Sequence, residues 1–153
     1  MRILSIDGGG IRGIIPGQVL VSLEAKLQQL TNDPNKRIAD VFDLIAGTST
    51  GGILTCLYLC PDENKRPKFS ATDAVNLYLQ NGDDIFDVSI FKQITSLGGI
   101  ADEKYSAVPL ERILAKYLAE LKLSELLKPC LVTSYDINRR QAKFFNSADV
   151  KAL

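Results

Sequence analysis

The chain has 153 residues, of which 46% are hydrophobic and 24% are charged, and its 18 basic and 18 acidic side chains cancel. This length suits one domain with a sizeable core, and the apolar content is too high for a disordered chain. A net charge of zero without a basic cluster argues against a dedicated nucleic-acid-binding protein. The sequence contains no histidine, so it supplies neither a Ser-His-Asp triad nor a histidine zinc site.

Three cysteines, Cys56, Cys60 and Cys130, are too few for a disulfide framework, and without histidine they do not indicate a metal site. We expect them to be small buried residues, and we expect no metal and no cofactor. The longest nearly apolar run, residues 53–60, is far shorter than the roughly 20 residues that span a bilayer. The composition therefore predicts a cytoplasmic chain whose contact with membranes is peripheral.

The first strand, turn and helix are predicted within residues 2–35. A short buried strand covers residues 2–6, and Asp7-Gly8-Gly9-Gly10 ends it. After Gly13 a helix begins, with Pro16 in its first turn, where a missing N–H costs little. Turn-forming residues at 32–35 end this helix. Its apolar residues recur at helical spacing: Val19, Leu20, Leu23, Leu27 and Leu30.

The same order of elements then repeats. A second strand at about residues 42–46 leads into a glycine-rich turn, and a compact apolar helix follows at about residues 50–59. Repeated strand, turn and helix are typical of βαβ units, so the sequence predicts an α/β domain with a mainly parallel sheet covered by helices.

The second half of the chain adds two helices and two strands to this prediction. Ser70 with Asp73 forms a capping box that starts a helix ending near Gly82. A second helix follows Pro109, with apolar residues at helical spacing as far as Leu121. Strands are predicted at residues 130–135 and 141–146, with a turn at residues 138–140 between them.

The turn after the second strand, Gly47-Thr48-Ser49-Thr50-Gly51, matches Gly-x-Ser-x-Gly. In such an elbow the serine has a strained backbone, and the glycines leave room where a Cβ would strike a neighbouring strand or helix. The bend presents the hydroxyl at the carboxyl end of the sheet and at a helix N-terminus, whose partial positive charge favours a developing oxyanion. A plain turn in which Ser49 caps the helix uses the same residues.

The turn after the first strand, Gly8-Gly9-Gly10-Ile11-Arg12-Gly13, matches Gly-x-Gly-x-x-Gly. Alone it fits a dinucleotide-binding loop, an oxyanion hole made of backbone N–H groups, or a flexible turn. A dinucleotide-binding loop also needs an acidic residue at the end of the next strand, whereas Asp33 lies in a proline-containing turn. Acyl transfer needs both a nucleophile and oxyanion donors, so the two turns together favour the oxyanion hole. Arg12 indicates either an anionic partner or a surface ion pair.

These two turns, their spacing and the stretch from Tyr135-Asp136 to Phe144-Phe145-Asn146 resemble the patatin-like phospholipase family over essentially the whole chain. The resemblance implies a three-layer α/β/α fold and hydrolysis of lipid or phospholipid esters. It also implies a Ser-Asp dyad without histidine, in agreement with the composition. By the same resemblance Ser49 is the nucleophile, and the backbone N–H groups of Gly9, Gly10 and Ile11 stabilise the oxyanion.

One part of the family pattern does not occur in this chain. The catalytic aspartate of the family lies in an Asp-Gly-Gly or Asp-Gly-Ala motif, and Asp7-Gly8 is the only Asp-Gly pair here. Asp7 belongs to the oxyanion signature, Asp136 to a strand end, and Asp149 lacks the glycine. We therefore expect residues 1–153 to be the N-terminal part of a single catalytic domain that ends before this motif. The segment alone should be nearly inactive, because a serine without a positioned base is a poor nucleophile.

Three other functions fit parts of the pattern. A nucleotide-binding α/β module would use Gly8 to Gly13, an acyltransferase would use the same acyl-serine chemistry, and a catalytically dead scaffold would need no aspartate. Transient contact with a membrane surface is expected around Ile85-Phe86 and Ile90-Phe91, where ordinary core packing is an equally good explanation.

Overall fold

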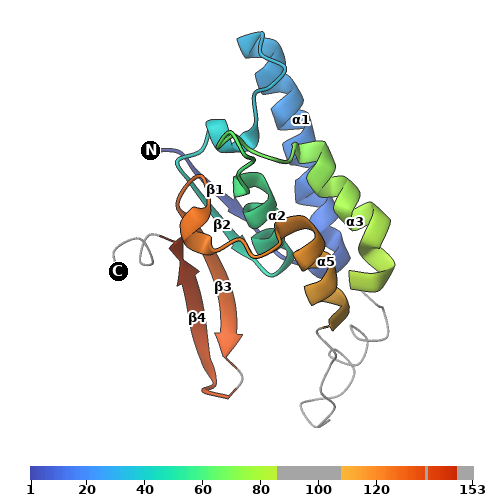
Figure 1. The fold of residues 1–153 in the computed structure, drawn as a ribbon, viewed down its shortest axis with the longest axis vertical. Helices are drawn as coiled ribbons and strands as arrows, with labels where there is room; N and C mark the ends of the chain where they lie inside the picture. The colour runs from blue at the N-terminus through green and yellow to red at the C-terminus, as the bar shows by residue number, and fades with distance from the viewer. Residues whose placement is uncertain (86–107, 137, 148–153) are drawn as a thin grey trace.

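The computed structural model describes residues 1–85, 108–136 and 138–147. Strands and helices alternate over residues 3–59, and further helices and then two consecutive strands follow (Figure 1). In chain order the elements are β1 (Ile3–Ile6), the 3₁₀ helix η1 (Gly10–Gly13), α1 (Ile14–Thr31), the 3₁₀ helix η2 (Ile38–Asp40), β2 (Leu44–Thr48), α2 (Thr50–Leu59), α3 (Ala71–Ile85), α5 (Val108–Leu118), the 3₁₀ helix η3 (Leu123–Glu125), β3 (Cys130–Asp136) and β4 (Gln141–Asn146).

The described strands form one sheet in the order β1-β2-β3-β4. β1 and β2 are parallel, with Ile3 opposite Leu44, and β2 and β3 are parallel, with Ile45 opposite Cys130. β4 runs antiparallel to β3, to which the turn at residues 138–140 connects it. The predicted α/β class with a mainly parallel sheet is therefore confirmed.

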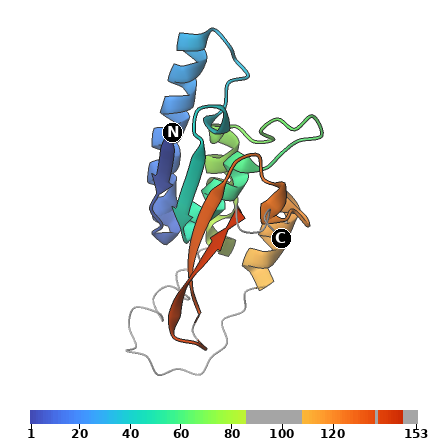
Figure 2. The ribbon, with the colours of Figure 1, turned by 90° about the vertical axis from the view of Figure 1, so that its left-hand side faces the viewer.

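The described α-helices lie on one side of this sheet (Figure 2). Parallel strands are joined by right-handed crossovers, and successive crossovers in one direction place their helices on the same face. The opposite face carries exposed apolar side chains, including Ile3, 55% exposed, and Phe144, 60% exposed. The described residues thus supply the sheet and one helical layer of the α/β/α arrangement that the resemblance implies.

The core lies between the sheet and α2. Leu54, Leu57 and Leu59 of this helix are buried, as is Ile45 of the central strand β2. A helix buried on all sides is apolar all round, which explains why residues 53–60 form the longest apolar run of the sequence. None of the described helices combines the length and the hydropathy that crossing a bilayer requires.

Most predicted elements occur where local sequence signals placed them. The capping box at the start of α3 is present: the Ser70 N–H donates to Asp73 Oδ2 at 2.9 Å, and the Asp73 N–H donates to Ser70 Oγ at 3.1 Å. The second strand is shifted, because it covers residues 44–48 instead of 42–46. Glycine usually weakens strands, which is why the predicted strand ends at residue 46. Gly47 nevertheless pairs with Ile6 of β1, and β2 therefore continues to Thr48.

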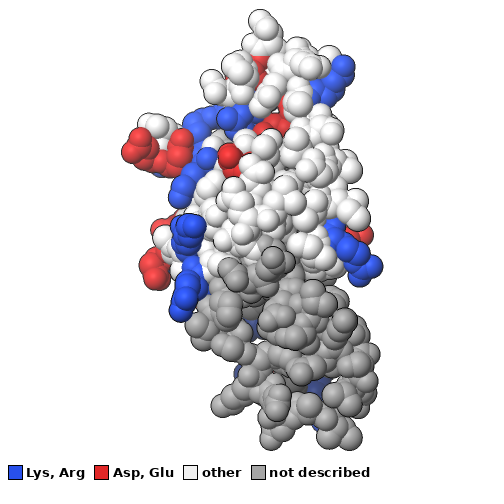
Figure 3. All heavy atoms as spheres, turned by 90° about the vertical axis from the view of Figure 1, so that its right-hand side faces the viewer, with Lys and Arg blue, Asp and Glu red and all other residues white. Residues whose placement is uncertain are grey.

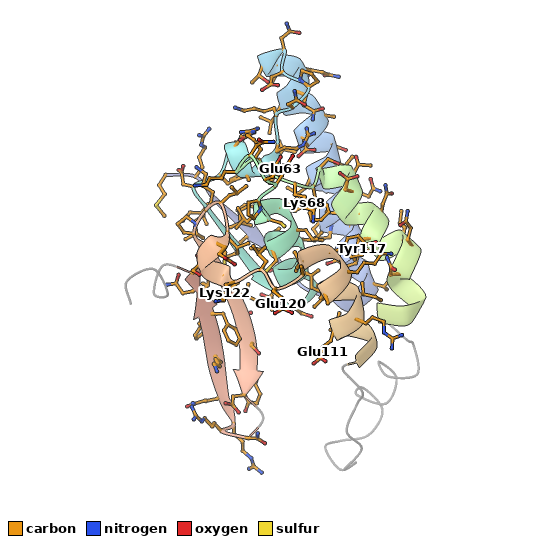
Figure 4. The ribbon with its side chains drawn as sticks, viewed as in Figure 1. Glu63, Lys68, Glu111, Tyr117, Glu120 and Lys122 are labelled. Atoms are coloured by element: carbon orange, nitrogen blue, oxygen red, sulfur yellow. The ribbon has the colours of Figure 1, made fainter. Side chains whose placement is uncertain are left out.

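α5 is connected to α3 and to the loop before it by polar contacts of Tyr117 (Figure 4). The Asn81 side-chain amide donates to the Tyr117 hydroxyl at 3.4 Å, and the Lys68 ammonium donates to the Tyr117 carbonyl at 3.5 Å.

Of the residues expected to contact membranes, Phe86, Ile90 and Phe91 lie outside the described ranges. Seen from the side of α3, acidic and basic side chains occur together at the margins of the described surface, so this face is not a basic patch (Figure 3).

Glu24 of α1 is a buried carboxylate, only 4% exposed. One of its oxygens accepts the N–H of Ile38, the first residue of η2, at 3.1 Å, and the other accepts the N–H of Ala71, the first residue of α3, at 2.9 Å. Both donors are groups that a helix start leaves without an intrahelical partner. A single side chain thus joins three elements, and its charge is favourable at both helix N-termini.

Candidate active site

Both glycine-rich turns leave the sheet at the same edge. β1 and β2 are parallel neighbours, with Ile6 opposite Gly47, so the segments that follow them emerge side by side at the carboxyl ends of the strands. This is the edge at which open α/β sheets bind their ligands. The fold therefore brings together the two motifs that lie about 40 residues apart in the sequence.

Ser49 occupies the bend between β2 and α2 with φ 53° and ψ −120°. A residue with a Cβ in such a region costs on the order of 1–3 kcal/mol, and the conformation persists only where surrounding contacts hold it. Ser49 is the N-cap residue of α2, yet its side chain makes no capping hydrogen bond, and the residue is exposed. The hydroxyl thus lies at the positive end of a helix without capping it.

The glycines on either side of Ser49 allow the backbone to pack closely around it. A Cβ on Gly47 would overlap the carbonyl oxygen of Gly51, and a Cβ on Gly51 would overlap the carbonyl oxygen of Ile6. Each glycine therefore makes room for a neighbouring backbone segment, one within the elbow itself and one on β1. The elbow consequently packs closely against the carboxyl end of β1.

The Gly8–Gly13 loop packs directly on this elbow. A Cβ on Gly8 would overlap the Thr48 carbonyl oxygen and would lie 2.7 Å from Ser49 Cβ. Gly10, with φ 60°, then starts η1, which continues into α1, so most of the segment is a helical turn. The first N–H groups of a helix have no partner within it, so the N–H groups of Gly10 and Ile11 lack an intrahelical acceptor.

Arg12 lies in the same loop and is exposed. Its Nε donates to the Gly9 carbonyl at 3.4 Å, and its backbone N–H donates to the same oxygen at 3.2 Å. No carboxylate of the described residues lies within 4 Å of its guanidinium nitrogens. Within the described part of the chain, the Arg12 guanidinium therefore contacts the Gly9 carbonyl of its own turn and forms no surface ion pair.

The underside of the elbow is anchored by two buried hydroxyls. The Tyr78 hydroxyl of α3 donates to the Thr50 carbonyl at 2.7 Å, and the Thr55 hydroxyl donates to the Gly51 carbonyl at 2.9 Å. Neither residue was predicted from the sequence to have a role in the site. Nothing in the local sequence identifies Tyr78, because its partner is 28 residues away and belongs to another helix.

A cavity of about 580 Å³ lies along β1 and α1 and extends to Gly8 and Arg12. Apolar side chains line most of it, including Leu4 and Ile15, and Ser49 is not among the lining residues. This cavity therefore adjoins the glycine-rich loop from outside and does not contain the elbow.

Asp7 and Asp136, two aspartates of the described chain, have different surroundings. Asp7 is exposed at the start of the glycine-rich loop. Asp136 accepts the backbone N–H of Arg139 at 3.0 Å and lies 3.9 Å from its guanidinium Nε, so it takes part in the turn between β3 and β4. Asp149 lies outside the described residues.

Comparison with known proteins places these features in a family context. A family model described as patatin-like phospholipase matches residues 4–152. The chain is 38% identical to Patatin-like protein 1 of Oryza sativa subsp. indica over all of its 153 residues, and 41% identical to Patatin-like protein 4 of Arabidopsis thaliana over 96% of them. It is 40% identical to Patatin-03 of Solanum tuberosum over 98% of its length. The chain spans 37% of the length of each of these relatives.

Proposed function

The chain belongs to the patatin-like phospholipase family, and we propose that Ser49 is the nucleophile with which the protein hydrolyses carboxylic esters of lipids. The observation that carries this proposal is the backbone of Ser49, which holds a strained conformation against Gly8 and leaves the side chain exposed. A serine that only capped α2 would need no such strain. Strained residues held by several contacts cluster at active sites.

In the proposed reaction the Ser49 hydroxyl oxygen attacks the acyl carbonyl carbon while a general base accepts the hydroxyl proton. The carbonyl oxygen becomes an oxyanion, which the N–H groups of Gly9, Gly10 and Ile11 stabilise by hydrogen bonds. The alcohol leaves with a proton, and an acyl-serine ester remains. Water then attacks this ester, releases the fatty acid and restores the hydroxyl.

We place the general base on an aspartate outside residues 1–153. The carboxylate of Asp136 takes part in its own turn, and Asp7 starts the loop that supplies the oxyanion donors. The substrate class of the proposal is a lipid or phospholipid ester, met at the surface of a membrane or micelle. Loss of one oxyanion donor in such sites raises the barrier by about 3 kcal/mol, so the loop should affect the rate far more than the affinity for substrate.

A fluorophosphonate probe, which modifies activated serines, tests the proposal on the full-length protein. We expect the protein to become labelled and to hydrolyse a fatty-acyl ester, and Ser49→Ala to abolish both activities. Ser22→Ala is the matched control, because Ser22 is an exposed serine of α1 whose hydroxyl donates only to the Gln18 carbonyl, at 3.2 Å. Equal labelling of Ser49→Ala and the control would remove Ser49 from the nucleophile role.

A further inference from the structure

We infer that Tyr78 is a positioning residue for the proposed nucleophile: its hydroxyl fixes the start of α2 and thereby holds Ser49 against the glycine-rich loop. This inference rests on the proposed function of Ser49. Tyr78 belongs to α3, outside both sequence motifs, and it does not touch the reacting atoms.

The side chain of Tyr78 reaches the junction between the two motifs from below. It is 0% exposed, and its hydroxyl donates to the carbonyl of Thr50, the residue directly after Ser49, at 2.7 Å. Its ring also approaches the end of the glycine-rich loop, because a Cβ on Gly13 would lie 3.4 Å from Tyr78 Cε1 and 3.0 Å from Thr50 Oγ1. One aromatic side chain therefore contacts both the elbow and the loop that faces it.

This contact acts on the part of the backbone that determines where the Ser49 hydroxyl lies. The strained φ and ψ of Ser49 persist only because neighbouring groups fix the residues on both sides. On one side Gly8 packs against Thr48 and Ser49. On the other side the hydrogen bond from Tyr78 fixes Thr50. Without this donor the first turn of α2 gains freedom to relax, and the hydroxyl moves relative to the oxyanion donors.

The consequence for the rate follows from the sensitivity of catalysis to geometry. A displacement of about 1 Å at a reacting group costs on the order of 100-fold in rate. A single hydrogen bond restrains a smaller movement, so we expect a loss of about tenfold in kcat when the hydroxyl is removed. Substrate affinity should not change, because Tyr78 is buried beneath the elbow and does not face the substrate side.

The test compares Tyr78→Phe with Tyr58→Phe in the full-length protein. Tyr58 of α2 is a matched control, because it is 1% exposed and its hydroxyl has no hydrogen-bond partner among the described residues. Both changes remove one buried hydroxyl, and only the first removes a donor to the elbow. For each variant we would measure kcat and KM on a p-nitrophenyl fatty-acyl ester, and the rate constant and final extent of fluorophosphonate labelling.

We expect Tyr78→Phe to lower kcat and the labelling rate constant about tenfold, with KM and the final extent of labelling unchanged, and Tyr58→Phe to match the wild type. Equal rates for the two variants would overturn the inference. A variant that does not fold, or whose labelled fraction falls at an unchanged rate constant, would instead assign the hydroxyl to stability. Labelling of Ser49→Ala like the wild type would contradict the proposed function itself, whatever Tyr78→Phe does.

Discussion

Replacing Ser49 by glycine should make the protein more stable, although it removes the proposed nucleophile. Ser49 has φ 53° and ψ −120°, a conformation in which its Cβ is strained and glycine is not. Ser49→Ala is the right reference, because alanine also lacks the hydroxyl but retains the Cβ and therefore the strain. The free energy of unfolding of the two variants then differs mainly by the backbone term.

The size of this difference can be worked out from two opposing contributions. Relief of the strain stabilises the folded glycine variant by about 1–3 kcal/mol. The greater freedom of glycine in the unfolded chain destabilises it by about 0.4–1 kcal/mol. We therefore expect Ser49→Gly to exceed Ser49→Ala in free energy of unfolding by about 1 kcal/mol, within a range of roughly 0–2.6 kcal/mol.

Urea denaturation of the full-length variants measures this difference, and Ser22 supplies a control of opposite sign. Ser22 lies in the middle of α1, where glycine is less favourable than alanine by about 1 kcal/mol, so Ser22→Gly should be the less stable variant of its pair. If Ser49→Gly were less stable than Ser49→Ala, as expected for the Ser22 pair, the elbow would not store strain. The inference that surrounding contacts force Ser49 into its conformation would then be refuted.

Two further predictions concern the buried carboxylate of Glu24 and the half-buried thiol of Cys56. Glu24→Gln leaves only one acceptor oxygen for the N–H groups of Ile38 and Ala71, so urea denaturation should show that the free energy of unfolding falls by about 2 kcal/mol. Glu111→Gln, on the exposed face of α5, should change this free energy little. Equal losses for the two variants would show that the buried carboxylate does not join the three elements. Burial, and to a smaller extent the nearby thiols of Cys130 and Cys60, raise the pKa of Cys56 to about 12. At pH 8 its thiolate fraction in the folded protein should therefore be about 1,000-fold smaller than in the unfolded chain, and alkylation followed by mass spectrometry should show slow labelling that denaturant accelerates; similar rates in both states would contradict this.

Features that depend on residues close together in the sequence were predicted accurately. The Ser70 and Asp73 pair forms the expected capping box, and the apolar run after Ser49 forms α2 over residues 50–59 as expected. The Gly-x-Ser-x-Gly spacing also has a local geometric reason, since a Cβ on Gly47 would overlap the carbonyl oxygen of Gly51 within the same elbow. In these cases the partners lie within a few residues of each other, so the sequence itself contains the interaction.

Features that depend on distant partners were not predicted. The Glu24 carboxylate accepts from Ala71, 47 residues away, and the Tyr78 hydroxyl donates to Thr50, 28 residues away. Without coordinates Glu24 is one of two charged residues of α1, and Tyr78 is an aromatic residue of α3. Helical spacing also overstated the buried face of α1, where Val19 and Leu30 are exposed. Periodicity identifies a helix, but the neighbouring elements decide which of its sides they cover.

The strained serine links these two kinds of feature. The glycines of the local sequence make the bend possible, but they do not hold it. Without other contacts Ser49 would relax to an ordinary backbone conformation of lower energy. The bend is retained because Gly51 meets the carbonyl of Ile6 from β1, Gly8 meets Thr48, and α3 donates a hydrogen bond to Thr50. Each of these contacts comes from a different segment of the chain. Placement of Ser49, the proposed nucleophile, is therefore a property of the assembled α/β fold, and a substitution that loosens β1 or α3 should lower the rate before it unfolds the protein.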